Sequence, residues 1–161
     1  MPEGVEVRLT AEEVSKYITN SKLVSIEILS GRYKRHGNPQ GFDEITSQLP
    51  LIINNVYNKG KGIFFHFDKD WFMYNTLGMT GQWTTTFQKH CNVKFLVQKP
   101  FPSLEILTIF FRDIRNFGTL KFVQGRDKLQ LLENRLGPDM MDESTDFNVF
   151  TNRVRKYNHK N

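Results

Sequence analysis

Short apolar stretches separated by turn-forming residues run through the middle of the sequence, and they limit the folds that it can adopt. We expect strands near residues 51–57, 62–67, 71–76, 80–87, 92–98, 104–111 and 119–123. The intervening residues 58–62, 68–70, 77–78, 99–103 and 116–118 are rich in Gly, Asn, Asp or Pro. Short strands this close in sequence pair antiparallel, so the predicted fold class is α+β, mainly β: a two-sheet antiparallel β-sandwich.

Helices are expected at the two ends of this strand series. The N-terminal segment carries apolar residues at helical spacing: Val7, Ala11, Val14 and Ile18. A half-buried strand follows over residues 22–29, and then a basic, irregular stretch over 30–50 with a short helix near 43–48. In the tail, Leu129, Leu132 and Leu136 predict one helix, and residues 147–157 predict a second amphipathic helix.

Composition narrows the class of protein before any motif is considered. The 161 residues carry a net charge of +5 with a pI of about 9.4, which is compatible with a polyanionic partner such as nucleic acid or with an ordinary basic surface. A single cysteine, Cys91, excludes a disulfide framework or a four-cysteine zinc site within this sequence and fits a reducing, intracellular setting. The polar N-terminus does not resemble a signal peptide, and no apolar run is long enough to span a membrane.

The N-terminus is the first candidate for chemistry. Removal of Met1 would leave Pro2 with a free secondary amine, and an α-amino group has an ordinary pKa of about 8. Such an amine can attack an electrophilic carbon and form a Schiff base, and the adjacent Glu3 can exchange protons. The plainer alternative is that Pro2 and Glu3 only start a helix.

Three further motifs carry candidate functional side chains on predicted turns or loops. Lys61 lies between glycines in KGKG, which leave space for it to reach a phosphate. The plainer alternative is that this segment is a solvated hairpin turn. Met79 lies in LGMTG, either as an adaptable apolar wedge or as a core methionine. Arg115 and Phe117 lie in RDIRNFG, whose basic and aromatic side chains suit filling the gap left by an extruded base. The plainer alternative is a turn at the edge of a sheet.

Taken in order, MPEG, GKG, LGMTG, DIRNFG and LGPD resemble the formamidopyrimidine-DNA glycosylase and endonuclease VIII family. The resemblance extends from Met1 to about Tyr157, and the Asn-, Lys- and Phe-rich composition resembles the members found in large DNA viruses. It implies base-excision repair of damaged double-stranded DNA by a bifunctional glycosylase and abasic-site lyase that needs no metal or organic cofactor.

The resemblance also implies a role for each candidate residue. Pro2 would attack C1′ of the damaged nucleotide, Glu3 would transfer protons on the opened sugar, and Lys61 would assist catalysis and contact phosphate. A second group, Met79, Arg115 and Phe117, would fill the void left by the flipped nucleotide. Val5 replaces a proline usual in the family, and Thr76 replaces a histidine of many formamidopyrimidine-type members, which favours oxidised pyrimidines.

The domain organisation departs from the family pattern. We assign residues 1–140 to the catalytic domain and residues 141–161 to the start of a helical domain, whose helix–two-turn–helix motif and zinc finger are absent from this sequence. Since phosphate contacts dominate affinity for DNA, we expect weakened binding and reduced or lost activity. The alternative is a non-catalytic remnant, or an interaction or DNA-binding module of the same fold, whose open face is covered by a protein partner.

Overall fold

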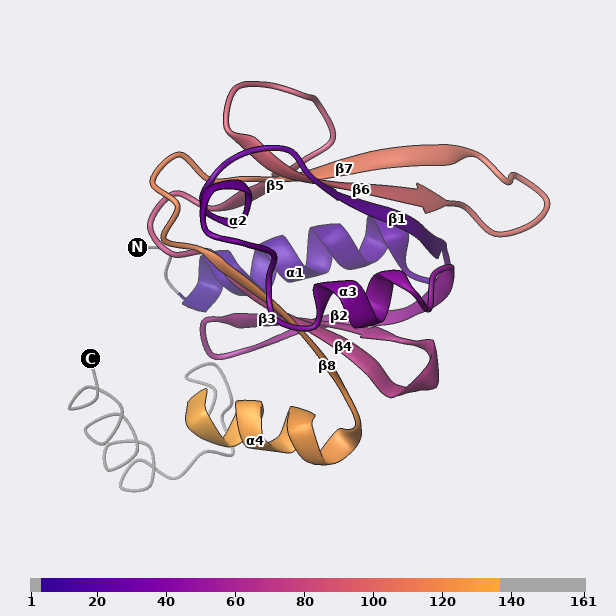
Figure 1. The fold of residues 1–161 in the computed structure, drawn as a ribbon. Helices are drawn as coiled ribbons and strands as arrows, with labels where there is room; N and C mark the ends of the chain where they lie inside the picture. Colours follow the sequence, from indigo (N-terminus) through magenta and orange to yellow (C-terminus); the bar gives the residue numbers. More distant parts are fainter. Residues whose placement is uncertain (1–3, 137–161) are drawn as a thin grey trace.

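The computed structural model describes residues 4–136, which form a strand-rich domain with a helix at each end (Figure 1). The helices are α1 (Gly4–Ile18), α2 (Arg32–Arg35), α3 (Phe42–Thr46) and α4 (Arg126–Leu136), with a short 3-10 turn η1 (Asp68–Asp70). The strands are β1 (Lys22–Ile28), β2 (Leu51–Lys59), β3 (Gly62–Phe67), β4 (Trp71–Thr76), β5 (Gln82–Thr84), β6 (Cys91–Gln98), β7 (Ile106–Arg112) and β8 (Thr119–Gln124). No helix among these residues is long and apolar enough to cross a membrane.

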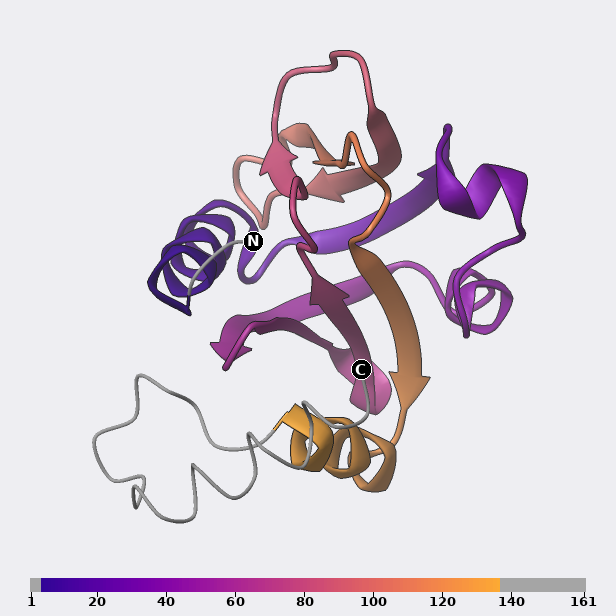
Figure 2. The ribbon, with the colours of Figure 1, turned by 90° about the vertical axis from the view of Figure 1, so that its left-hand side faces the viewer.

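All strand pairs are antiparallel, in the order β5-β7-β6-β1-β2-β3-β4-β8. β1 and β2 pair through only two residue pairs, Lys22 with Ile52 and Leu23 with Leu51. The sheet turns sharply at this narrow junction, so that β5-β7-β6-β1 and β2-β3-β4-β8 form two layers (Figure 2). The predicted α+β, mainly antiparallel class is confirmed, although the two layers stay joined at β1–β2 as one hydrogen-bonded sheet.

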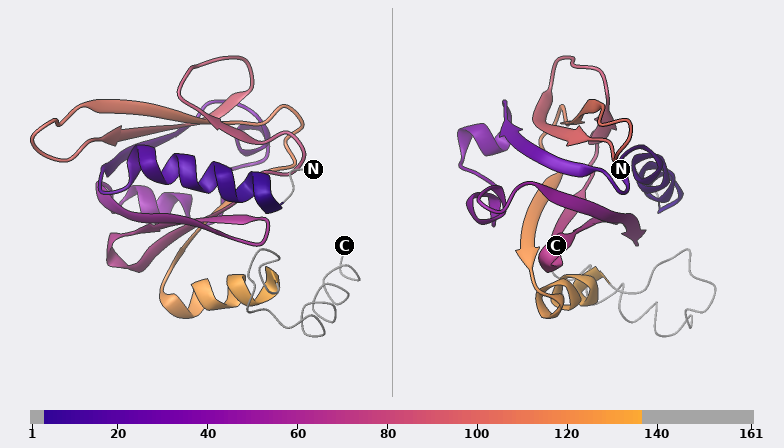
Figure 3. Two further views of the ribbon diagram at one scale, coloured as in Figure 1. Left: turned by 180° about the vertical axis from the view of Figure 1, so that it is seen from behind. Right: turned by 90° about the vertical axis from the view of Figure 1, so that its right-hand side faces the viewer.

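The main core fills the space between the two layers. Its largest buried residues come from both halves of the sheet, including Phe65, Phe67, Met73, Phe95 and Phe111. The helix α1 runs along the open side between the layers and buries the four residues that the periodicity selected: Val7, Ala11, Val14 and Ile18 (Figures 2 and 3). Burial of these apolar side chains is the main force that holds the layers together.

A second, smaller core lies on the outer face of β3, β4 and β8, where α4 packs. Phe64, Phe72 and Val123 of the strands contact Leu129 of α4, with Leu132 partly buried beside them. The leucine spacing therefore predicted α4 correctly, but the predicted helix over residues 147–157 lies outside the described residues.

Two local predictions differ from the structure. The strand expected over 80–87 is only β5 (Gln82–Thr84), since the Thr84 hydroxyl accepts a hydrogen bond from the Thr86 N–H at 3.2 Å and closes a local turn. The irregular stretch over 30–50 contains α2 in addition to the expected short helix, which is α3.

A partly buried hydrogen bond joins the two layers. The Trp83 ring of β5 packs against Phe65, Phe95 and Phe111, with ring centroids 5.1–5.3 Å apart. Its Nε1–H donates to Oδ1 of Asn75 on β4 at 2.9 Å, and Asn75 is fully buried. Loss of this donor would leave a buried acceptor unsatisfied, which is costly.

We expect Trp83→Phe to lower the free energy of unfolding, measured by urea denaturation. The loss should exceed that of the same Trp-to-Phe change at a site without a hydrogen bond by about 1–3 kcal/mol, because Asn75 loses its donor. Trp71→Phe is the matched control, since the buried Trp71 Nε1 has no hydrogen-bond partner among the described residues. A loss from Trp83→Phe no larger than that from Trp71→Phe would contradict this prediction.

Candidate active site

Four segments distant in sequence meet at one end of the domain (Figure 1). They are the start of α1, the tip of the β2–β3 hairpin, the β4–β5 loop (residues 77–81) and the β7–β8 loop (residues 113–118). An open pocket of about 220 Å³ lies among them, lined by Val7, Lys61, Tyr74, Thr76, Leu77, Gly78 and Phe117. We take this pocket as the candidate site because it brings predicted residues from separate motifs together.

A larger pocket of about 410 Å³ lies farther along α1, between Glu13 and Tyr17 of that helix and Trp83 and Thr84 of β5. It contains none of the residues that the sequence motifs selected. The smaller pocket is therefore the better candidate site, because it contains Lys61 and Phe117 from two of the sequence motifs.

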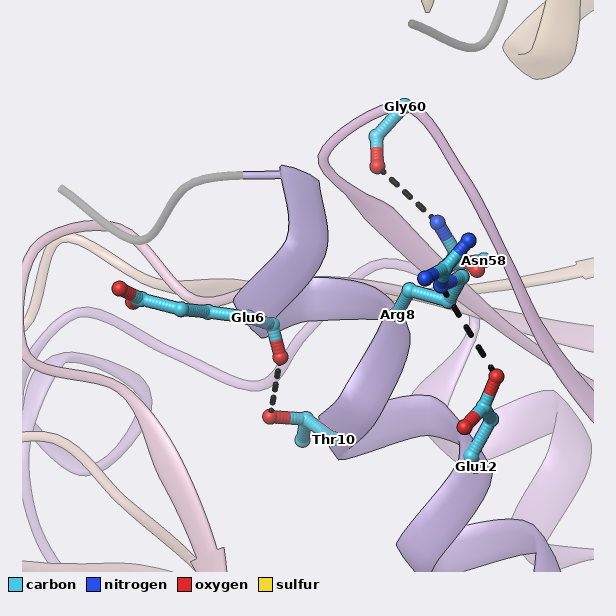
Figure 4. Close-up of polar contacts among 6 residues, drawn as sticks. All are labelled: Glu6, Arg8, Thr10, Glu12, Asn58 and Gly60. Atoms are coloured by element: carbon cyan, nitrogen blue, oxygen red, sulfur yellow. Dashed lines mark hydrogen bonds and ion pairs between the residues drawn. The ribbon is translucent and has the colours of Figure 1, made fainter. Parts of the chain in front are cut away.

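The hairpin tip presents Lys61 to the pocket. Gly60 adopts a left-handed conformation with φ +58°, and its carbonyl accepts a hydrogen bond from the Asn58 side chain at 3.3 Å. Figure 4 shows this tip beside α1, where Arg8 points toward Asn58 and pairs with Glu12 at 3.9 Å. The hairpin tip therefore lies against the first turns of α1.

The two lysines around the tip have different surroundings. Lys59 Nζ bonds to Glu133 Oε2 of α4 at 3.4 Å, which ties the base of the hairpin to the outer helix. Lys61 is exposed and lines the pocket. Among the described lining residues Lys61 is the charged one, while Lys59 bonds to α4.

The pocket wall on β4 is formed by Tyr74 and Thr76, which share one face of the strand. Burial raises the pKa of Tyr74 to about 12, so the phenol stays neutral at physiological pH. The Thr76 hydroxyl lies 2.7 Å from the Thr119 hydroxyl and accepts the Thr119 N–H at 3.1 Å. Sequence analysis did not select Tyr74, but its position two residues before Thr76 on the same strand face is the signal that identifies it.

The two loops carry the remaining predicted residues on the surface. Met79 is 48% exposed and Phe117 is 57% exposed, and Arg115 is also exposed. Large apolar side chains held outward on loops suit contact with an apolar partner surface, such as the faces of stacked bases. Lys61 and Phe117 line the pocket directly, whereas Met79 follows the lining residue Gly78.

Pro2 and Glu3 lie outside the described residues. Within residues 4–136 no cluster of His, Cys, Asp or Glu side chains has the arrangement of a metal site. The described part of the site therefore offers the exposed ammonium group of Lys61, the exposed guanidinium of Arg115, hydroxyl groups and the projecting side chains of Met79 and Phe117.

We expect a spectrophotometric titration of tyrosinate to show a late phase near pH 12, to which Tyr74 and the equally shifted Tyr57 contribute because burial raises the pKa of both. The folded pKa exceeds the ordinary value of 10, so their contribution to stability is complete below pH 10 and is lost as the pH rises toward 12. Tyr74→Phe should remove part of the late phase and reduce the loss of stability over this interval. An unchanged late phase would contradict the assignment.

Comparison with known proteins gives a consistent result. Residues 1–120 match the family model of the formamidopyrimidine-DNA glycosylase N-terminal domain. The formamidopyrimidine-DNA glycosylase of Lactococcus lactis subsp. cremoris is 26% identical over 165 residues, covering 97% of this chain and 56% of that protein. The corresponding protein of Bartonella tribocorum is 27% identical over 156 residues, covering 88% of this chain and 52% of that protein.

Solved structures share the fold. The Lactococcus lactis enzyme bound non-covalently to DNA with an abasic site superposes with a TM-score of 0.72 at 24% identity, covering 96% of this chain and 57% of that one. MutM in complex with DNA containing carbocyclic 8-oxo-G superposes with a TM-score of 0.75 at 25% identity and the same coverage. The chain thus spans little more than half the length of the relatives it matches.

Proposed function

We propose that this chain, which belongs to the formamidopyrimidine-DNA glycosylase family, removes an oxidised base from duplex DNA and cleaves the strand at the resulting abasic site. The observation that carries the proposal is the meeting of Lys61 and Phe117 in one pocket beside the start of α1, within the matched residues 1–120. Damaged DNA is the proposed partner, in keeping with the DNA-bound relatives of the same fold.

The proposed nucleophile is the amine of Pro2. Pro2 precedes Gly4, the first residue of α1, by two positions, and at roughly 3.3–3.6 Å per residue it reaches no more than about 7 Å from that residue. Val7 of the same helix lines the pocket. Chain connectivity therefore supports an amine that reaches the pocket from the start of α1.

The proposed reaction forms and breaks bonds at C1′ of the damaged nucleotide. The Pro2 nitrogen bonds to C1′ as the bond from C1′ to the base breaks, and the base leaves with a proton. The sugar ring opens as its ring oxygen takes a proton, for which Glu3 is the proposed donor, and the Pro2 nitrogen and C1′ form a cationic Schiff base. Loss of a proton from C2′ then expels the 3′ phosphate, and water releases the enzyme.

The described residues have supporting roles in this proposal. Lys61 pairs with a phosphate beside the damaged nucleotide, since an ammonium group on a short glycine-flanked tip approaches the backbone closely. Once the nucleotide is extruded, Met79, Arg115 and Phe117 enter the gap, where exposed apolar surface is exchanged for contact with bases. These steps use amine, carboxyl and apolar groups, so we expect activity to persist in a metal chelator.

We propose residues 1–140 as the catalytic domain and residues 141–161 as the beginning of a helical domain. The latter segment lies outside the described residues. Its proposed role is to continue from α4, which packs on the outer face of β3, β4 and β8.

Trapping with borohydride tests the proposed function. The protein is incubated with a duplex holding an abasic site and, separately, with duplexes holding an oxidised purine or an oxidised pyrimidine. We expect a covalent adduct that mass spectrometry locates on the N-terminal peptide, and the two lesion duplexes report base preference. Binding of duplex DNA without any adduct would instead support a non-catalytic DNA-binding module of the same fold.

We expect Lys61→Gln to slow trapping on the abasic duplex by roughly tenfold to a hundredfold, because an interaction with a charged group is worth about 1.5–3 kcal/mol. Lys59→Gln is the matched control, since Lys59 lies on the other side of Gly60 and bonds to Glu133. Its trapping rate should stay within about threefold of the unmodified protein. Similar losses for the two variants would contradict a specific role for Lys61.

A further inference from the structure

The two loops that carry Met79, Arg115 and Phe117 are also the two connections that cross between the sheet layers in this part of the chain. The β4–β5 loop leads from the lower layer to the upper one, and the β7–β8 loop leads back (Figure 1). Their ends are fixed by the pairing of β4 with β8 and of β5 with β7, and direct bonds between the loops add to this constraint.

Asp113 is the residue that joins them. It follows β7, is only 2% exposed, and uses both carboxyl oxygens in short hydrogen bonds. Oδ1 accepts the hydroxyl of Thr80 from the opposite loop at 2.6 Å, and Oδ2 accepts the N–H of Gly118 in its own loop at 2.7 Å. Bonds to a carboxyl group that is shielded from water are stronger and more specific in direction than exposed ones.

Thr80 closes the connection from the other side. Its hydroxyl donates to Asp113 and accepts the backbone N–H of Arg115 at 2.9 Å. One hydroxyl of the Met79 loop thus holds both the buried acid and the backbone of a predicted void-filling residue. Thr80 lies next to Met79 in sequence, so this contact connects the Met79 loop to the backbone at Arg115.

The β7–β8 loop is held from behind as well. The Asn92 side chain of β6 donates to the Asp113 carbonyl at 3.0 Å and to Oδ1 of Asn116 at 3.1 Å. The Arg32 guanidinium of α2 donates to the carbonyls of Asn116 and Gly118 at 3.4 and 3.2 Å. The loop therefore cannot shift freely to compensate for a change at Asp113.

Close backbone contact leaves little space between the loops. A Cβ placed on Gly78 would lie 2.6 Å from both the Gly118 nitrogen and the Phe117 carbonyl carbon of the other loop. The backbones of the two loops therefore lie too close for a side chain at Gly78, and a displacement of one loop is felt by the other.

We propose that the Asp113–Thr80 pair positions the two loops as one unit, so that Met79, Arg115 and Phe117 enter a DNA duplex together. The void-filling role rests on the proposed function, whereas the coupling of the loops stands on the hydrogen bonds alone. Neither residue contacts the reacting atoms in this proposal, and both act through the side chains that they position.

The first test compares duplex and single-stranded substrates, because a single strand has no base stack to fill. We expect Thr80→Val to slow borohydride trapping on a duplex abasic site by about tenfold to a hundredfold, while trapping on a single-stranded abasic site changes by less than about twofold. Thr80→Ser keeps the hydroxyl and should restore the duplex rate. The matched control Thr46→Val removes a half-buried hydroxyl that bonds only within and beside α3, and should leave both rates unchanged.

The outcomes separate the alternatives. An equal fall on both substrates in Thr80→Val would assign the pair a purely structural role and overturn the proposal, as would no change on either. If the unmodified protein traps neither substrate, the proposed function fails, and the coupling is decided by the second measurement.

The second measurement is amide hydrogen exchange read by NMR, which needs no DNA. The Gly118 N–H bonds to Asp113 and not to Thr80, so its exchange reports whether Thr80 holds Asp113 in place. We expect Thr80→Val to accelerate Gly118 exchange by roughly fivefold to tenfold, with no change in Thr46→Val. An unchanged Gly118 rate in Thr80→Val would show that the loops are independent and would overturn the coupling.

Discussion

The packing of two sheet layers against each other is the constraint on which the rest of this structure depends. β1 and β2 share only two residue pairs, so the sheet can bend there and bury its inner face in one aromatic core. The bend brings the β4–β5 and β7–β8 connections to one end, beside the start of α1 and the β2–β3 hairpin tip. The candidate site is thus a consequence of how the layers close.

Polar bonds then give this apolar arrangement a defined geometry. Trp83 and Asn75 join the layers within the core, and Asp113 and Thr80 join the two crossing connections at its edge. Both pairs are largely shielded from water, where an unsatisfied partner is costly, so each favours one relative position of the layers. The hydrophobic effect supplies most of the stability, and these directional bonds select among similar packings.

The proposed repair chemistry divides between these two kinds of structure. The reactive groups are few and local: an amine and a carboxyl group at the N-terminus and one ammonium group at a hairpin tip. In this proposal Met79, Arg115 and Phe117 would act on the DNA, and they would gain their effect from being held outward at a fixed spacing. If the two loops move as one unit, as proposed, less ordering would be needed when DNA binds.

Much of this protein follows from the sequence by itself. The helical period of Val7 to Ile18, the short strands and the leucine spacing of α4 are local patterns, and they predicted the elements and the mainly antiparallel class. The ordered motifs likewise indicated the family and selected Lys61, Met79, Arg115 and Phe117. Only the tertiary structure decided that Tyr74 lines the pocket, that α2 braces the β7–β8 loop and that Asp113 joins Thr80. These contacts link residues 33 to 86 positions apart, and no local periodicity encodes which distant side chains meet when two layers close.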